Sequence, residues 1–166
     1  MATKENLQAA FAGESQANRK YLAFAKKAEA DKMPQVAKLF RAAAGAETIH
    51  AHAHLKVLDG VKSTAYNLKA AVEGEGYEFK TMYPKFIKEA DAENNQAAGV
   101  SFRNAMAVEE VHEKLYSDAL AAVEQGKDLP PATIHICTIC GNTVVGNAPD
   151  KCSVCGALQP KFSAVK

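Results

Sequence analysis

All four cysteines of this 166-residue chain lie after residue 136, in two C-x-x-C pairs. The pairs are Cys137–Cys140 and Cys152–Cys155. Four thiols at this spacing are typical of one tetrahedral metal ion rather than of a disulfide framework. The piece that carries them, residues 129–166, is too short to bury an adequate core alone, so a bound metal would supply the missing stability.

A break at residues 126–131 separates this piece from the rest of the chain. The break combines a helix-ending glycine, Gly126, with a stiff pair, Pro130–Pro131. Before it, the chain contains only two prolines, and its apolar residues recur at helical spacing in four blocks. We therefore predict an all-α domain over residues 1–128 and a small metal-bound β domain over residues 129–166.

The four blocks predict four helices of roughly 25 to 30 residues, hence a four-helix bundle about 40 Å long. The first helix ends before residues 31–34 and the second at Gly60. Ser63 and Thr64 can cap the third helix, and the fourth follows Asn94–Asn95. Pro84 lies inside the third helix and predicts a kink there.

Each apolar stripe is interrupted near the middle of its helix by carboxylates or imidazoles. In chain order these residues are Glu14, Glu47 and His50, Glu75 and Glu78, and Glu109 and His112. Mid-helix positions of antiparallel helices meet in one layer, where five unpaired carboxylates would each cost several kcal/mol. One Glu from each of two helices plus Glu-x-x-His from each of the other two is the di-iron carboxylate pattern, and two metal ions would remove the penalty.

Alternative interpretations exist for the separate motifs. A single Glu-x-x-His on a helix is commonly surface decoration, and Glu75 and Glu78 lie beside Glu73, as an acidic surface turn would. Cysteine spacing does not distinguish iron from zinc. Attachment to a di-iron bundle favours iron, because such a bundle needs an electron source and zinc has no redox chemistry.

Taken together, the seven bundle residues and the four cysteines resemble the rubrerythrins, which join a ferritin-like di-iron bundle to a rubredoxin-like iron site. The resemblance covers essentially the whole chain. It implies that Glu47 and Glu109 bridge two irons. It also implies that Glu14 binds one of these irons, while Glu75 and His112 bind the other.

The resemblance further implies that Glu78 and His50 exchange as ligands, with the carboxylate binding one iron when oxidised and the histidine when reduced. Tyr21 and Tyr83 match the site tyrosines of the family, although they could equally be core aromatics. Two residues depart from the usual pattern. Ser153 stands where proline is usual and Asn142 where an aromatic is common, which puts the reduction potential of the four-cysteine site in doubt.

The short connection between the second and third helices has a topological consequence. The ferritin-like arrangement sets these helices parallel, which requires a crossover of roughly 40 Å, whereas five extended residues from Gly60 to Thr64 reach about 17 Å. Either the bundle is a simple up-down-up-down one, or the hairpins are exchanged between two chains. We favour a homodimer with exchanged hairpins, because the resemblance implies ferritin-like ligand placement.

The activity implied by the resemblance is reduction of hydrogen peroxide to water by a non-haem di-iron peroxidase. Electrons would pass from the four-cysteine iron, fed by an external reductase with NADH as the ultimate donor. The alternatives are a ferroxidase or oxygen-reducing enzyme, an iron-storage protein, and a zinc-ribbon interaction module on a helical dimer.

Charge and hydropathy exclude other classes of partner. The chain has 20 Lys and Arg against 19 Asp and Glu, so no basic excess favours nucleic acid. Its first residues are polar, without the apolar stretch of a secretory signal, and no uncharged stretch predicts a membrane-spanning helix. We expect a cytoplasmic protein with no membrane partner.

Overall fold

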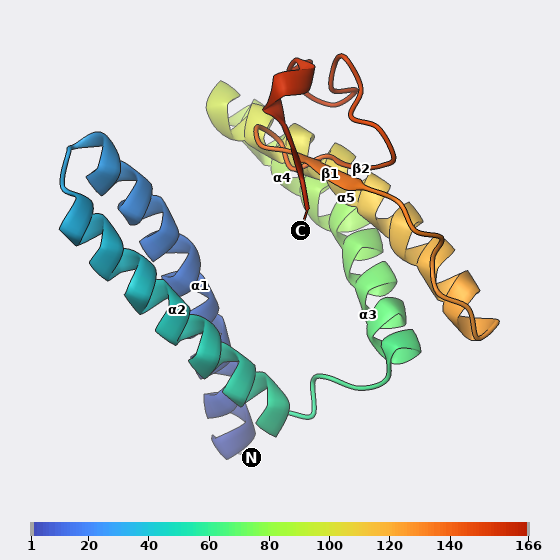
Figure 1. Cartoon of the computed structure of the whole chain (residues 1–166), viewed down its shortest axis with the longest axis horizontal. Coiled ribbons are helices and arrows are strands. Elements are labelled where there is room, and N and C mark those ends of the chain that lie inside the picture. Colours follow the sequence, from blue (N-terminus) through green and yellow to red (C-terminus); the bar gives the residue numbers. More distant parts are fainter. Residues whose placement is uncertain (1, 166) are drawn as a thin grey trace. The chain divides into compact units, whose positions relative to one another are not determined.

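The computed structural model describes residues 2–165 in two compact units, one ending at Lys62 and the other beginning at Ser63 (Figure 1). The first unit is a hairpin of α1 (Ala2–Ala30) and α2 (Pro34–Val57). The second unit contains α3 (Thr64–Tyr77), the π-helix η1 (Glu78–Met82), α4 (Tyr83–Ala92), α5 (Gln96–Glu124) and a small sheet. The predicted order, four helices followed by a small β domain, is confirmed, the third helix being the continuous run from α3 to α4. Within residues 2–165, none of the helices combines the length and apolar character needed to cross a membrane.

Small residues line the contact between α1 and α2, which run side by side in Figure 1. The buried alanines of this contact are Ala25, Ala28, Ala37, Ala44 and Ala51. Because an alanine side chain ends at Cβ, the two helices can approach closely. The buried side chain of Asn18 fixes their register, since its amide donates to the Ala44 carbonyl at 2.7 Å and to Thr48 Oγ1 at 2.8 Å.

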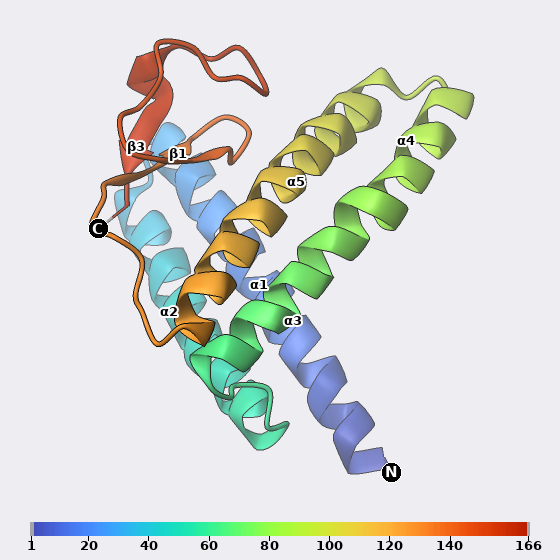
Figure 2. The same ribbon diagram turned by 90° about the vertical axis from the view of Figure 1, so that its right-hand side faces the viewer.

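In the second unit, the run from α3 to α4 packs along α5 (Figure 2). Its π-helix lies directly before Tyr83 and Pro84, where the sequence predicts a kink. Proline has no N–H and its ring clashes with the carbonyl four residues earlier, so a regular α-helix cannot continue through it undisturbed. The wider π turn absorbs this disturbance, and the Tyr83 N–H bonds the Glu78 carbonyl five residues back.

The helix ends follow one pattern. Lys32, Asp59, Asn94 and Gly126 each adopt a left-handed conformation directly after a helix, with φ between 56° and 70°. At the first of them, the Met33 N–H bonds the Ala28 carbonyl at 2.8 Å, closing the helix in a Schellman motif. Ser63 caps α3 as predicted, its Oγ accepting from the Tyr66 N–H.

The C-terminal domain is a three-stranded antiparallel sheet in the order β2-β1-β3. Its elements are β1 (Ile134–Cys137), β2 (Thr143–Val145), the 3-10 helix η2 (Gln159–Lys161) and β3 (Phe162–Ala164). Each C-x-x-C pair is followed by a glycine with positive φ, 88° at Gly141 and 74° at Gly156. Each cysteine loop therefore closes with a left-handed glycine, a conformation that a residue without a Cβ adopts readily.

Candidate metal centres

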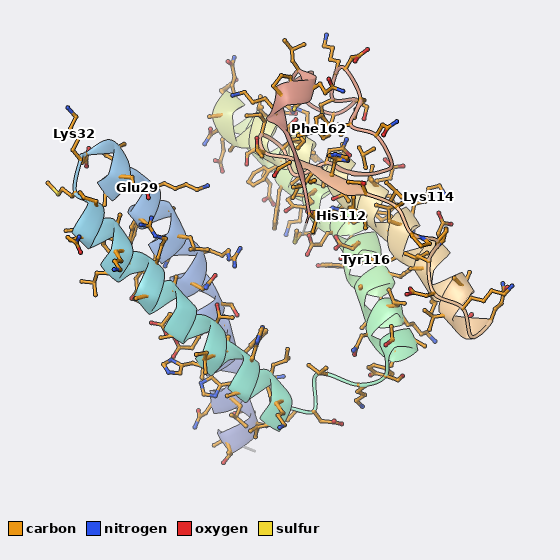
Figure 3. The ribbon with its side chains drawn as sticks, in the orientation of Figure 1. Glu29, Lys32, His112, Lys114, Tyr116 and Phe162 are labelled. Atoms are coloured by element: carbon orange, nitrogen blue, oxygen red, sulfur yellow. The ribbon has the colours of Figure 1, made fainter. Side chains whose placement is uncertain are left out.

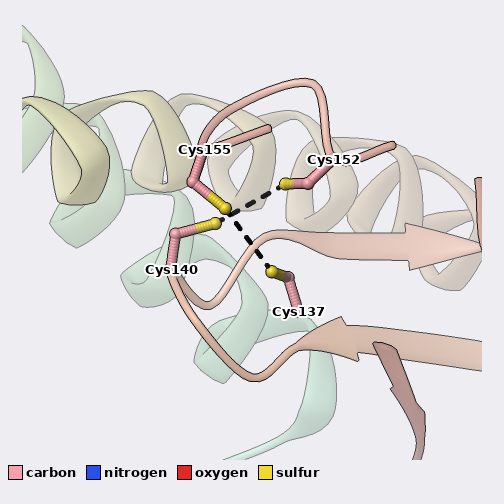
Figure 4. Close-up of side chains that lie close together, drawn as sticks. All are labelled: Cys137, Cys140, Cys152 and Cys155. Carbon is pink, nitrogen blue, oxygen red and sulfur yellow. Dashed lines mark hydrogen bonds between the residues drawn. The ribbon is translucent and has the colours of Figure 1, made fainter. Parts of the chain in front are cut away.

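The four cysteine sulfurs point toward one another from the two loops (Figure 4). Cys137 Sγ lies 3.7 Å from Cys155 Sγ, and Cys140 Sγ lies 3.7 Å from Cys152 Sγ. A tetrahedral ion about 2.3 Å from each sulfur requires sulfur–sulfur separations of about 3.8 Å. The arrangement therefore fits a single metal ion, with Cys137 and Cys152 buried.

Backbone N–H groups face these sulfurs and favour the thiolates. At Cys152, burial opposes ionisation, but the N–H groups of Cys155 and Val154 outweigh it and lower the pKa to about 6. At Cys140, burial raises the pKa to about 12, although the backbone N–H of Asn142 acts to lower it. One sulfur thus ionises readily while its neighbour holds a proton, an imbalance that a bound cation removes by stabilising all the thiolates.

In the first hairpin, Glu14 of α1 meets Glu47 and His50 of α2, with ligand atoms within 4.8 Å of one another. His50 Nδ1 lies 3.2 Å from Glu47 Oε2. A hydrogen bond from Glu14 to Glu47 raises the pKa of Glu14 and lowers that of Glu47, so the two carboxyls share a proton. This group offers two oxygens and one nitrogen to a metal.

In the second hairpin, Glu75 of α3 meets Glu109 and His112 of α5 at the same spacing. His112 Nδ1 lies 2.9 Å from Glu109 Oε2 and 3.9 Å from Glu75 Oε1. Burial, then the nearby Glu109, raises the pKa of Glu75 to about 7. Ligand distances of about 2.1 Å to a divalent ion match this cluster, and such an ion would offset the repulsion between its carboxylates.

Glu78 and Tyr83 lie at the two ends of the π turn, close to this second group. Burial, then the charge of Glu109, raises the pKa of Glu78. Burial, then the charges of Glu78, Glu109 and Glu75, raises the pKa of Tyr83, so its phenol stays protonated. Glu78 is not among the three residues whose ligand atoms converge, although its charge is felt by the same carboxylate cluster.

The remaining predicted residue, Tyr21, packs in an aromatic cluster of the first hairpin. Its ring centroid lies 6.1 Å from that of Phe40 and 6.3 Å from that of Phe24. Tyr83 has the matching position in the second hairpin, 6.3 Å from both Phe86 and Phe102. Both tyrosines are half-buried.

His112 also contacts the C-terminal domain. Its Nε2 lies 2.9 Å from Thr143 Oγ1 at the start of β2, and the ring of Tyr116 lies one turn further along α5 (Figure 3). Because the Thr143 hydroxyl donates to the Gly141 carbonyl at 3.3 Å, its oxygen accepts from the His112 Nε2–H. The lone pair of Nδ1 is then directed at Glu109 and Glu75, the orientation of a metal-binding imidazole whose other nitrogen is fixed by a hydrogen bond.

An apolar cavity of about 550 Å³ adjoins this contact, between α5, the linker and the sheet. His112 and Thr143 are part of its wall, together with apolar side chains such as Leu115, Leu129 and Val145. The hydrogen bond between the imidazole and the hydroxyl therefore lies beside a largely apolar wall, where it is stronger than in bulk water.

Sequence reasoning missed Thr143, because nothing in its local sequence indicates a partner 31 residues away. The π turn, in contrast, left a signal. Glu14 and Tyr21 are seven residues apart, whereas Glu75 and Tyr83 are eight apart, and one extra residue at matched helical positions indicates a local change of helical period.

Comparisons with known proteins agree with this arrangement. The family model described as rubrerythrin matches residues 5–120, and that of the rubrerythrin rubredoxin-like domain matches residues 135–163. Rubrerythrin-2 of Clostridium acetobutylicum is 32% identical, over 98% of this chain and 96% of that protein. Nigerythrin of Nitratidesulfovibrio vulgaris is 36% identical, over 98% of this chain and 86% of that protein.

Solved structures of nigerythrin also match. The partially reduced state aligns with a TM-score of 0.59 and 34% identity, covering 98% of this chain and 86% of the nigerythrin chain. The four-thiol and carboxylate clusters fit iron, which accepts thiolate, imidazole and carboxylate ligands. The chain belongs to the rubrerythrin family of iron-dependent oxidoreductases.

Proposed function

We propose that this protein is a non-haem di-iron peroxidase that reduces hydrogen peroxide to water. Residues 1–128 would hold the di-iron site and residues 129–166 the four-cysteine iron, which receives electrons from NADH through a separate reductase. The observation that carries the proposal is the hydrogen bond from His112 to Thr143. It links the domain that holds the four thiols to a member of the carboxylate cluster, and an enzyme that needs electrons at that cluster benefits from such a link.

The ligand assignment follows the two three-residue groups. Glu47 and Glu109 would be the carboxylates that hold both irons, and each also faces a histidine three residues on. Glu14 would hold one iron, and Glu75 with His112 would hold the other. Glu78 and His50 are the exchanging pair. In support, His50 is the more exposed histidine, with 55% of its side chain accessible against 25% for His112.

Charge gives a reason for the exchange. Five carboxylates against two ferrous ions leave one excess negative charge, whereas two ferric ions carry two more positive charges. A carboxylate that binds only the oxidised pair therefore keeps the site closer to neutral. Glu78 suits this role because it begins the π turn, where the helix has already departed from α geometry.

When bound, two ferrous ions supply the two electrons that cleave the O–O bond of peroxide, which with two protons gives two water molecules. The chain's own residues position and supply those protons. The raised pKa of Glu78 keeps its carboxyl protonated at higher pH than an ordinary glutamate. The Tyr83 phenol, also held neutral, can donate a hydrogen bond to the departing oxygen.

A complete di-iron site needs the ligands of both hairpins, and we propose that two chains supply them by exchanging hairpins in a homodimer. Each site would then take Glu14, Glu47 and His50 from one chain and the remaining ligands from the other. The short connection after α2 supports this arrangement, since residues 58–63 reach about 20 Å when extended.

A mixed dimer of Glu47→Gln and Glu109→Gln chains tests the exchange. With exchanged hairpins, one site of the mixed dimer has both substitutions and the other has none, so one full iron pair binds per dimer. Without exchange, every site has one substitution, and the mixed dimer binds no more bundle iron than either parent. Two different affinity tags isolate the mixed species for metal analysis.

The first test of the function is metal content per chain, followed by anaerobic single turnover. About three irons per chain are expected, and peroxide added to the fully reduced protein should restore the visible thiolate-to-iron absorption within one turnover. A Cys140→Ser variant should still consume one equivalent of peroxide but fail to sustain turnover with the reductase. Faster oxidation by dioxygen than by peroxide would instead favour an oxygen-reducing or ferroxidase role, and uptake of many irons into a large shell would favour storage.

A Glu78→Ala variant tests the exchange of ligands. We expect slower turnover with both bundle irons still bound, because Glu78 is an added ligand rather than a bridge. Loss of both irons would show that Glu78 is a permanent part of the site, and the exchange would then be wrong.

A further inference from the structure

Asn142 is one of the few buried polar residues of the chain, with 3% of its surface accessible. It follows Gly141 directly, behind the first cysteine loop. Its side-chain amide donates to Cys152 Sγ at 3.7 Å, across the cluster in the opposite loop. Its backbone N–H faces Cys140 Sγ, and its carbonyl accepts from the Cys137 N–H at 2.9 Å.

The two cysteine loops have equivalent backbone N–H donors, and the side-chain donor of Asn142 is the difference between them. In the first loop the N–H two residues after the second cysteine, that of Asn142, faces Cys140. In the second loop the equivalent N–H, that of Ala157, faces Cys155. The second loop thus has an equivalent backbone donor, but the alanine side chain has no amide group that could donate to a sulfur of the opposite loop.

A donor to a metal-bound sulfur affects the two oxidation states unequally. Reduction of a four-thiolate iron adds one negative charge, part of which resides on the sulfurs. A hydrogen bond to sulfur stabilises that added charge, so it favours the reduced form and raises the reduction potential. Burial strengthens the effect, because no water competes for the sulfur at a side chain that is 3% accessible.

We propose that the side-chain amide of Asn142 raises the reduction potential of the four-cysteine iron through its hydrogen bond to Cys152. Asn142 is a positioning residue, because it touches a ligand of the metal and not a substrate. The inference rests on the part of the proposed function in which the four cysteines bind iron. It makes the small domain a better electron acceptor from the reductase and a weaker donor to the bundle.

The test is a redox titration of the full-length, iron-loaded protein, followed by the visible absorption of the four-cysteine iron. Asn142→Leu keeps the branching at Cγ and the backbone donor but removes the amide. Asn142→Ser keeps a polar group too short to reach Cys152. Ser153→Ala is the matched control, since Ser153 is exposed and also departs from the family's usual residue.

Both Asn142 variants should shift the one-electron reduction equilibrium about tenfold toward the oxidised form, a fall of 59 mV, while Ser153→Ala stays at the wild-type potential. Unchanged potentials in iron-loaded Asn142 variants, or an equal fall in Ser153→Ala, would overturn the inference. Loss of the four-cysteine iron in both Asn142 variants would overturn it too, because the residue would then be needed for folding. Absence of this iron from the wild-type protein would instead refute the proposed function.

Discussion

The α1–α2 hairpin and the hairpin of α3 to α5 repeat one pattern of residues. Each has a glutamate on its first helix and a Glu-x-x-His on its second, and each histidine faces its glutamate through Nδ1. The aromatic clusters also match, Tyr21, Phe24 and Phe40 corresponding to Tyr83, Phe86 and Phe102. In both hairpins the phenylalanine of the second helix precedes the glutamate by seven residues.

Two differences break this correspondence. The second hairpin has one additional residue between its first glutamate and its tyrosine, and the π turn that absorbs it begins at an extra carboxylate, Glu78. In addition, Nε2 of His112 is fixed by Thr143, whereas Nε2 of His50 has no such partner among residues 2–165. One hairpin thus has a histidine held by a hydrogen bond and an additional acid, and the other has a more exposed histidine, the one proposed to exchange. The comparison teaches that two halves with the same pattern of ligands can differ in how firmly each one holds its histidine.

The strongest test of the correspondence between the hairpins is to remove the two carboxylates that we propose as bridging ligands. Glu47→Gln and Glu109→Gln keep side-chain size but remove a charge that, in the proposed site, is shared by both irons. Each should lose both bundle irons, keep the four-cysteine iron and lower peroxide turnover by more than about 100-fold, since even partners of metal ligands cost 10- to 100-fold. Metal analysis and steady-state assays measure both effects. Glu110→Gln, at the exposed neighbour of Glu109, should change neither, and retention of both irons by only one of the two variants would show that the hairpins are not equivalent.

The matched histidines should behave differently. His112→Ala should lose one bundle iron, because we propose this imidazole as a permanent ligand and Thr143 holds its ring in place. His50→Ala should keep both irons in the oxidised protein and slow turnover roughly tenfold, within the range for disturbed metal ligation. Iron content of the oxidised proteins separates the two results. Equal iron loss from both variants would contradict the distinction between a fixed and a mobile histidine.

A substitution at Thr143 tests whether its hydrogen bond to His112 couples the second hairpin to the small domain. Thr143→Val keeps the shape but removes the hydroxyl, at a cost of about 1 kcal/mol for one hydrogen bond, or about fivefold in the docking equilibrium. Reoxidation of the four-cysteine iron after a peroxide pulse should slow accordingly in stopped-flow absorption. The potential of the four-cysteine site should stay unchanged, and Thr143→Ser should restore the rate. A wild-type rate in Thr143→Val would remove this contact from the electron route.

The smallest expected effect is on the pH dependence of stability in the metal-stripped protein. The pKa of Glu75 is about 7 against an ordinary 4.5, so the folded protein holds a proton that the unfolded chain releases between these values. Stability from this group is therefore present below pH 4.5 and is lost as the pH rises to 7. Glu75→Gln should change the melting temperature more favourably at pH 7.5 than at pH 4.5, and the difference between the two changes should be about 2–4 °C.

Glu14→Gln is the comparison in the first hairpin. There the raised pKa of Glu14 and the lowered pKa of Glu47 oppose each other, so the pH dependence should be smaller. A larger change for Glu14→Gln than for Glu75→Gln would reverse the expected order of the hairpins.

The sequence predicted the helices, the cysteine cluster and the candidate ligands because these depend on local periodicity and fixed spacing. Glu47 and His50, or Cys137 and Cys140, are brought together by one helical turn or one loop. It did not predict the contact of His112 with Thr143 or of Asn142 with Cys152, since both join segments whose approach depends on packing rather than on spacing. At Asn142 the sequence revealed an unusual residue, but its role required the position of the opposite loop.

Asn142 and Thr143 are consecutive residues, one bonded to a sulfur of the small domain and the other to an imidazole of α5. A small domain transplanted from a relative would bring its own pair of residues to this point. Such a chimera would fold and bind its iron, and yet it would transfer electrons to the bundle slowly. The reason is that the residue in the place of Thr143 would not match the imidazole of His112. The interchangeable module in this protein is therefore the small domain together with the surface of α5 beneath it, and protein engineers who recombine rubrerythrins would do well to cut the chain before α3 rather than at the linker.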